Sequence, residues 1–125
     1  MTKILIVDDE DNIRLFYSEE LQDEGYEVVT AKDGHRLIDR IQREKPQLII
    51  MDIKLPGYNG LDLMQEIRRE FYDLPVILCS AYSSFRGERK SISANYYVVK
   101  SSDLTELKEK VKRALEEHIP SGSDG

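Results

Sequence analysis

Cysteine is almost absent from the sequence, which excludes one common way of stabilising a small protein. The single cysteine among the 125 residues is Cys79, so no disulfide can form within the chain. No Cys/His grouping has the spacing of a zinc site either. Disulfides persist mainly in oxidising compartments, and this chain has none that would need such a compartment. We therefore expect a cytoplasmic protein.

Long apolar runs and an excess of basic residues are also missing. Only four consecutive apolar residues, Ile4 to Val7, precede Asp8, which is too few for a signal peptide or a membrane span. Lysine and arginine number 18 against 24 aspartates and glutamates, which leaves a net charge of −6. A surface of this sign repels nucleic-acid phosphates. We therefore expect no membrane association and no direct binding of nucleic acid.

The remaining composition is that of one globular domain. With 40% apolar and 34% charged residues, the chain has the apolar content that disordered proteins lack. Its length suffices for a single core. We predict a domain over residues 1–118, followed by a flexible tail or linker stump at 119–125, which is rich in serine and glycine.

Short apolar runs alternate with segments of helical periodicity. Helical stripes are expected from Ile13 to Leu21, Leu37 to Ile41, Leu63 to Phe71 and Leu104 to Leu115. Parallel neighbouring strands need such crossover connections, so the alternation predicts a doubly wound α/β fold with a five-stranded parallel sheet and helices on both faces. The predicted strands are Ile4–Val7, Glu27–Thr30 at a sheet edge, Leu48–Met51, Val76–Cys79 and Tyr96–Val99.

One connection departs from this regularity. Residues Ser83 to Ser93 offer only Phe85 and Ile92 as apolar anchors and contain Gly87. We expect a loosely held helix there. Elsewhere the helix starts carry capping residues, with Asn59 before one helix and Asp103 before the last.

Chemically active side chains gather where the predicted strands end. Asp8 and Asp9 follow the first strand, Asp52 the third, Ser80 the fourth and Lys100 the fifth. In open α/β sheets ligands bind beyond these strand ends. Neighbouring carboxylates repel one another unless a cation neutralises them, and oxygen ligands suit Mg²⁺. A hydroxyl and an ammonium beside them indicate phosphoryl chemistry.

Four motifs in order make the chain resemble a response-regulator receiver domain from Lys3 to about His118. The resemblance implies a flavodoxin-like sheet of order 2-1-3-4-5. The motifs are Ile6-Val7-Asp8-Asp9-Glu10, then Met51-Asp52 with Leu55-Pro56-Gly57-Tyr58-Asn59-Gly60, then Cys79-Ser80-Ala81-Tyr82, then Tyr97-Val98-Val99-Lys100.

The resemblance assigns a role to each motif position. Asp52 is expected to be the phosphoacceptor, with Mg²⁺ bound by Asp8, Asp9, Asp52 and the backbone carbonyl of Lys54. Ser80 and Lys100 are expected to bind the phosphoryl group.

Two further pairs are expected to regulate the phosphorylated state. Ser80 and Tyr97 would form the switch, and Tyr97 would change rotamer with phosphorylation. Lys54 and Tyr82 lie two residues past Asp52 and Ser80, and as large side chains they would shield the acyl phosphate from water. We therefore expect slow self-dephosphorylation.

The implied function is a phosphorylation-controlled signalling switch rather than an enzyme. A histidine kinase or histidine phosphotransfer protein would supply the phosphoryl group. The surface around the fourth helix, fifth strand and last helix would then change toward an unknown protein target, with residues Ser83 to Ser93 as the moving segment. Both a stand-alone regulator and the receiver of a longer protein are compatible with this sequence.

One departure from the family pattern keeps an alternative open. Serine rather than proline follows Lys100, so we expect a trans Lys100–Ser101 bond, because a cis bond without proline costs about 2.5–4 kcal/mol. A receiver-like interaction module working without phosphorylation is the first alternative. A Mg²⁺-dependent phosphohydrolase with an aspartyl intermediate is the second alternative. Its two acids are usually separated by one residue, whereas Asp8 and Asp9 are adjacent.

Overall fold

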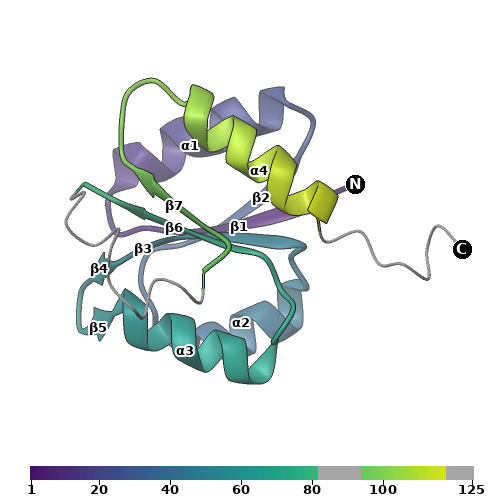
Figure 1. Cartoon of the computed structure of the whole chain (residues 1–125). Helices are drawn as coiled ribbons and strands as arrows, with labels where there is room; N and C mark the ends of the chain where they lie inside the picture. Colours follow the sequence, from purple (N-terminus) through teal and green to yellow (C-terminus); the bar gives the residue numbers. More distant parts are fainter. Residues whose placement is uncertain (82–93, 118–125) are drawn as a thin grey trace, which may run out of the picture.

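The computed structural model describes residues 1–81 and 94–117, and its centre is a parallel sheet (Figure 1). The sheet has five strands in the order β2-β1-β3-β6-β7, and all four pairings are parallel. Counted along this sheet, the order is the predicted 2-1-3-4-5, with β2 at an edge as expected. The strands are β1 (Lys3–Val7), β2 (Glu27–Ala31), β3 (Leu48–Asp52), β6 (Val76–Ser80) and β7 (Tyr96–Val99).

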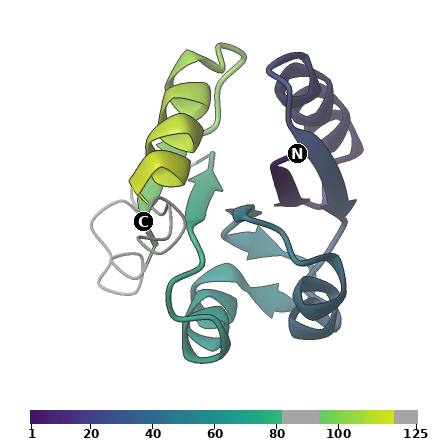
Figure 2. The same cartoon turned by 90° about the vertical axis from the view of Figure 1, so that its right-hand side faces the viewer.

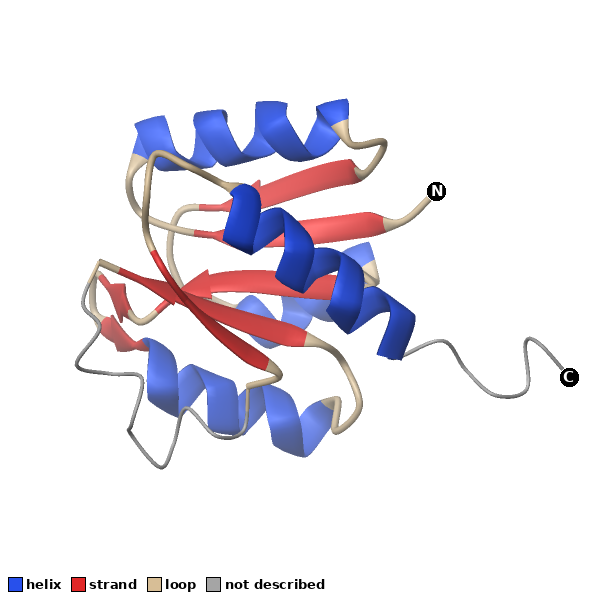
Figure 3. Ribbon diagram, turned by 45° about the horizontal axis from the view of Figure 1, so that its top comes forward, coloured by secondary structure: helices blue, strands red, loops and turns tan. Residues whose placement is uncertain are grey.

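Helices cover both faces of the sheet, which confirms the predicted layering. Helices α1 and α4 lie on one face and α2 and α3 on the other (Figures 1 and 3). Their bounds are α1 (Asp11–Asp23), α2 (Leu37–Glu44), α3 (Gly60–Glu70) and α4 (Thr105–Glu117). The expected helix at Ser83 to Ser93 lies outside the described residues.

The sheet divides the core into two apolar layers. Alternate residues of a strand point to opposite faces, so Leu5 and Val7 of β1 pack in the layer of α2 and α3. Ile4 and Ile6 pack in the layer of α1 and α4. The whole of β3 and β6 is buried. Such two-sided burial explains why these strands read as continuous apolar runs.

A small hairpin after β3 was not predicted. Strands β4 (Lys54–Leu55) and β5 (Tyr58–Asn59) pair antiparallel, and the turn between them contains Gly57 at a φ of +73°. Two-residue strands are too short to produce a hydrophobic period. The turn residues were the only available signal.

Glycine is required where this hairpin enters α3. The amide of Gly60 donates to the carbonyl of Ile53 at 2.6 Å. A Cβ at position 60 would lie 2.5 Å from the Ile53 Cα and 2.6 Å from the Asp52 carbonyl oxygen. The first turn of α3 therefore rests directly on the end of β3.

The predicted capping residues occupy the helix starts. The Asn59 side chain accepts from the amide of Leu61 at 2.8 Å, which caps α3. The Asp103 carboxylate accepts from the amide of Thr105, the first residue of α4, at 2.9 Å. No helix among the described residues is long and apolar enough to cross a bilayer.

Candidate functional site

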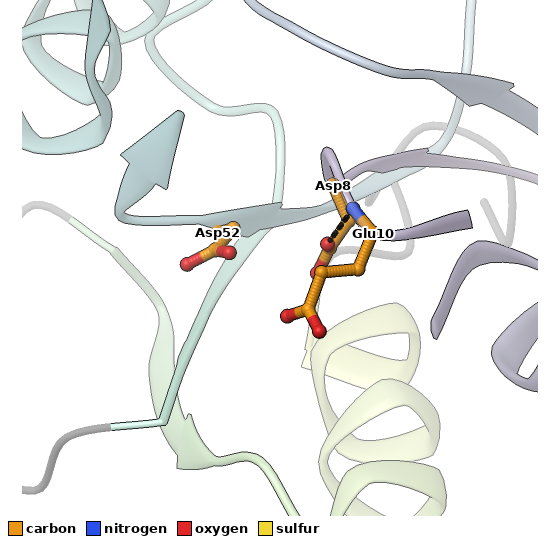
Figure 4. A group of neighbouring side chains, drawn as sticks. All are labelled: Asp8, Glu10 and Asp52. Carbon is orange, nitrogen blue, oxygen red and sulfur yellow. Dashed lines mark hydrogen bonds between the residues drawn. The ribbon is translucent and has the colours of Figure 1, made fainter. Parts of the chain in front are cut away.

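Three carboxylates converge at the edge of the sheet where the strands end (Figure 4). Asp8 follows β1, Glu10 stands two residues later, and Asp52 is the last residue of β3. Each offers an oxygen that lies within 4.8 Å of the other two. Asp8 and Asp52 are buried, whereas Glu10 is exposed. So close a group needs positive charge to be stable at neutral pH.

The Lys100 ammonium supplies that charge by contacting all three acids. Its Nζ lies 2.9 Å from Asp8 Oδ2, 3.0 Å from Glu10 Oε1 and 2.8 Å from Asp52 Oδ2. Lys100 follows β7 directly, so the cluster joins the ends of β1, β3 and β7. The site is thus an acidic pocket in which one side-chain cation is shared.

The electrostatics follow from burial and this shared cation. Burial raises the pKa of Asp8, and the hydrogen bonds from Lys100 and from the amide of Glu10 oppose that rise. Burial alone would lower the pKa of Lys100, but its hydrogen bonds to Asp52, Asp8 and Glu10 raise it well above its usual range. Lys100 is therefore charged at every physiological pH.

Backbone hydrogen bonds hold the acids in place. The Glu10 amide donates to Asp8 Oδ1 at 2.9 Å, the dashed line in Figure 4. The Lys54 amide donates to Asp52 Oδ1 at 3.2 Å. The Lys100 contacts of Asp8 and Asp52 thus fall on their Oδ2 atoms, while the other oxygen of each aspartate accepts from the amide two residues further on.

Glu10 was missed by sequence reasoning, which grouped Asp9 with Asp8 and Asp52. Asp9 is exposed and is not part of the carboxylate group that the structure brings together. The backbone at Glu10 is extended, with φ −86° and ψ 116°, and in extended chain residues i and i+2 point the same way. The choice of Glu10 over Asp9 thus depends on the backbone after β1.

The other predicted residues differ in their positions and exposures. Ser80 ends β6 and is buried, and the amide of Lys100 donates to its carbonyl at 2.7 Å. Tyr97 is half-buried on β7 and packs against the layer of α2 and α3. Lys54 is exposed beside Asp52, and Tyr82 lies outside the described residues.

The bond that follows Lys100 is trans, as expected. No peptide bond within residues 1–81 and 94–117 is cis. The Lys100 side chain nevertheless reaches Asp52, so serine in place of proline at position 101 is compatible with the site.

Comparison with known proteins identifies relatives over most of the chain. The sequence profile of the family described as "Response regulator receiver domain" matches residues 4–112. Sporulation initiation phosphotransferase F of Bacillus subtilis is 32% identical over 115 residues, which are 90% of this chain and 93% of that protein.

Solved structures of response regulators are similar to this chain at higher sequence identity. Response regulator TrrA of Thermotoga maritima, crystallised in complex with Mg²⁺–BeF, is 47% identical with a TM-score of 0.89, covering 92% of this chain and 100% of its own. The same regulator in complex with the histidine kinase ThkA superposes with a TM-score of 0.86, covering 92% of this chain and 99% of that one.

Proposed function

The chain belongs to the response regulator receiver domain family, and we propose that Asp52 is the side chain on which it accepts a phosphoryl group. The protein is a phosphoacceptor of two-component signalling rather than an enzyme with a substrate of its own. The observation that carries the assignment is the position of Asp52 at the end of the central strand β3, buried among two further acids and Lys100.

Mg²⁺ is the cofactor that these residues fit. The side chains of the group offer carboxylate oxygens, and their contacts with the Lys100 ammonium show that the group attracts a cation. Asp8, Glu10 and Asp52 would hold the ion together with the carbonyl of Lys54, and Asp9 remains a predicted ligand. When bound, the ion neutralises charge on the transferring phosphoryl oxygens. The TrrA structure in complex with Mg²⁺–BeF supports this choice.

Transfer needs little from the protein beyond position and charge. An Asp52 oxygen forms a bond to phosphorus while the phosphorus–nitrogen bond to the donor histidine breaks, and the electron pair leaves with the imidazole. A carboxylate needs no general base to act as a nucleophile. The Lys100 ammonium would then pass from the Asp52 carboxylate to a phosphoryl oxygen, where the Ser80 hydroxyl also donates.

The same contacts supply the switch. A phosphoryl group adds about −1.5 to −2 of charge beside Ser80 and Lys100. Ser80 would move toward it, and Tyr97, three residues before Lys100 on β7, would follow inward. The surface of β7 and α4 then changes toward a protein target. The segment predicted to move, Ser83 to Ser93, lies outside the described residues.

A histidine kinase or histidine phosphotransfer protein is the proposed donor. The ThkA–TrrA complex supports a kinase as the partner. On this chain, α1 begins three residues after Asp8 and exposes Leu15 by 61% and Phe16 by 36%. Apolar side chains exposed beside an acceptor site are suited to docking a donor protein. We place this receiver, residues 1–118 with a tail at 119–125, in the cytoplasm.

Mass spectrometry after incubation with acetyl phosphate and Mg²⁺ tests the assignment. The protein should gain the mass of one phosphoryl group, and Asp52→Ala should abolish the gain. Asp9→Ala and Glu10→Ala, compared for the Mg²⁺ concentration that they require, separate the predicted ligand from the one the structure places in the cluster. A gain retained by Asp52→Ala would refute the acceptor assignment. No gain in the parent protein would favour the unphosphorylated interaction module.

A further inference from the structure

A cavity of about 780 Å³ opens at the end of the sheet opposite the carboxylate cluster. Figure 2 views the molecule from this end, where the strands begin. The connection between α3 and β6 forms one wall, and the last turns of α4 form another. Nothing in the phosphoacceptor mechanism uses this cavity.

The wall between α3 and β6 is held rigidly. The Arg68 guanidinium donates to the carbonyls of Phe71, Tyr72 and Leu74, at 3.4, 2.9 and 2.8 Å. The amide of Leu74 also donates to the Phe71 carbonyl at 3.2 Å. The backbone is therefore fixed while its side chains remain available, and a preformed surface loses little entropy on binding.

This fixed wall presents apolar groups to solvent. The Tyr72 side chain is 79% exposed, and Phe71 and Leu74 are only half-buried. Half-buried Leu115 faces the same cavity from α4. A second cavity of about 310 Å³ lies on the other side of Phe71 and Leu74, against Ile41 of α2. Phe71 and Leu74 line both cavities, and exposed apolar groups gathered in this way mark an interaction site.

Charge around the cavity selects the kind of partner. Glu70, Asp73 and Glu116 line it, against Lys112 as the lysine in its wall. All four side chains are exposed. An acidic rim around an apolar floor repels nucleic acid and anionic lipid, and it attracts a basic protein surface.

We propose that this cavity is a second docking site, which takes an apolar or aromatic side chain from a protein segment flanked by lysine or arginine. Tyr72 and Leu115 would contact the inserted side chain, while Asp73 and Glu116 pair with the flanking cations. Because Asp52 lies at the other end of the strands, such a partner could stay bound while a phosphoryl donor occupies the acceptor site.

Heteronuclear NMR titration of the full chain with short synthetic peptides tests the proposal without phosphorylation. The probes carry a central Phe, Leu or Trp between lysines and arginines, and matched probes carry aspartates and glutamates instead. Basic probes should shift the amides of Tyr72 and Leu115 saturably. Tyr72→Ala should weaken binding at least tenfold, since exposed aromatic anchors carry most interface affinity. Tyr58→Ala, at the acceptor end, is the matched control and should bind like the parent.

Charge reversal separates the proposed partner from others. The double variant Asp73→Lys, Glu116→Lys should prefer the acidic probes. The proposal is overturned by equal binding of both probe sets, by shifts confined to the acceptor end, or by no saturable shift. Concentration-dependent dimerisation that Tyr72→Ala abolishes would make a second copy the occupant. Contacts between Ile119 and Tyr72 in the peptide-free protein would make the chain's own tail the occupant. Either result also overturns it.

Discussion

Replacing Lys100 with methionine removes the charge that allows three carboxylates to share one site. The side chains of Lys100, Asp8 and Asp52 are only 10%, 4% and 7% exposed, so those two contacts are poorly screened. Glu10 is 59% exposed, and its contact adds at most about 1 kcal/mol. Removing one partner from a buried ion pair costs about 3–5 kcal/mol. Because Glu10 is exposed, we expect the lower end, a loss of about 3 kcal/mol.

Urea denaturation in EDTA at neutral pH measures that loss, and adding Mg²⁺ identifies its cause. An ion that binds only the folded state stabilises it by about 2.7 kcal/mol at one hundred times its dissociation constant. In the variant, Mg²⁺ no longer competes with the lysine for the acids, so it should stabilise the variant more than the parent. Lys108→Met is the matched control, because the Lys108–Glu20 pair at 2.8 Å has side chains 29% and 36% exposed. It should leave the urea midpoint close to that of the parent.

The pH dependence of Lys100→Met has a definite sign. Burial already raises the pKa of Asp8 from its ordinary 3.8, and loss of Lys100 removes the first of the hydrogen bonds that oppose the rise. The folded variant then holds a proton that the unfolded chain has released, so stability falls as the pH rises through the raised pKa. The difference from the parent in EDTA should therefore be larger at pH 8 than at pH 5. A variant within 1 kcal/mol of the parent at neutral pH, or a reversed pH trend, would refute this account of the site.

Three further predictions use other parts of the structure. Gly60→Ala should lower the free energy of unfolding by about 2–3 kcal/mol, because the added Cβ would meet backbone atoms. Gly57→Ala has open space around the added Cβ and should cost only about 1–2 kcal/mol, from the left-handed backbone conformation. Equal losses in urea denaturation would contradict this difference. Burial raises the pKa of Cys79 to about 11, so about one thiol in a thousand is ionised at pH 8. A thiol reagent should therefore label Cys79 only when the protein unfolds. Rapid labelling of the native protein would contradict this burial. If Lys54 shields the acyl phosphate from water, the phosphorylated Lys54→Ala variant should lose phosphate faster than the phosphorylated parent. An unchanged rate of phosphate release would show that Lys54 has no such role.

The fold was predictable because its central strands are buried on both sides. The apolar runs at Leu48–Met51 and Val76–Cys79 lie within β3 and β6, and the edge position of β2 follows from its weaker pattern. The hairpin β4–β5 was missed because pairing in two-residue strands depends on the turn and on Gly60, not on periodicity. Strands of two residues leave no periodic pattern in a sequence.

The candidate site was predictable in its strand-end residues and less so in the loops. Asp8, Asp52 and Lys100 meet because the ends of parallel strands share one edge, which the order of the sheet determines. The choice between Asp9 and Glu10 depends on the backbone angles after β1, and charge alone does not distinguish them. The lifetime pair Lys54 and Tyr82 and the switch role of Tyr97 stay predictions, since they concern the phosphorylated protein.

One backbone hydrogen bond makes Ser80 and Lys100 a single mechanical unit. The Lys100 amide donates to the Ser80 carbonyl at 2.7 Å, immediately after the last paired residues of β6 and β7. A backbone shift at either residue is therefore transmitted to the other through this bond. Substitutions at Ser80 and Lys100 that aim to change the response to phosphorylation should therefore be designed together, because a change at one position alters the backbone that supports the other.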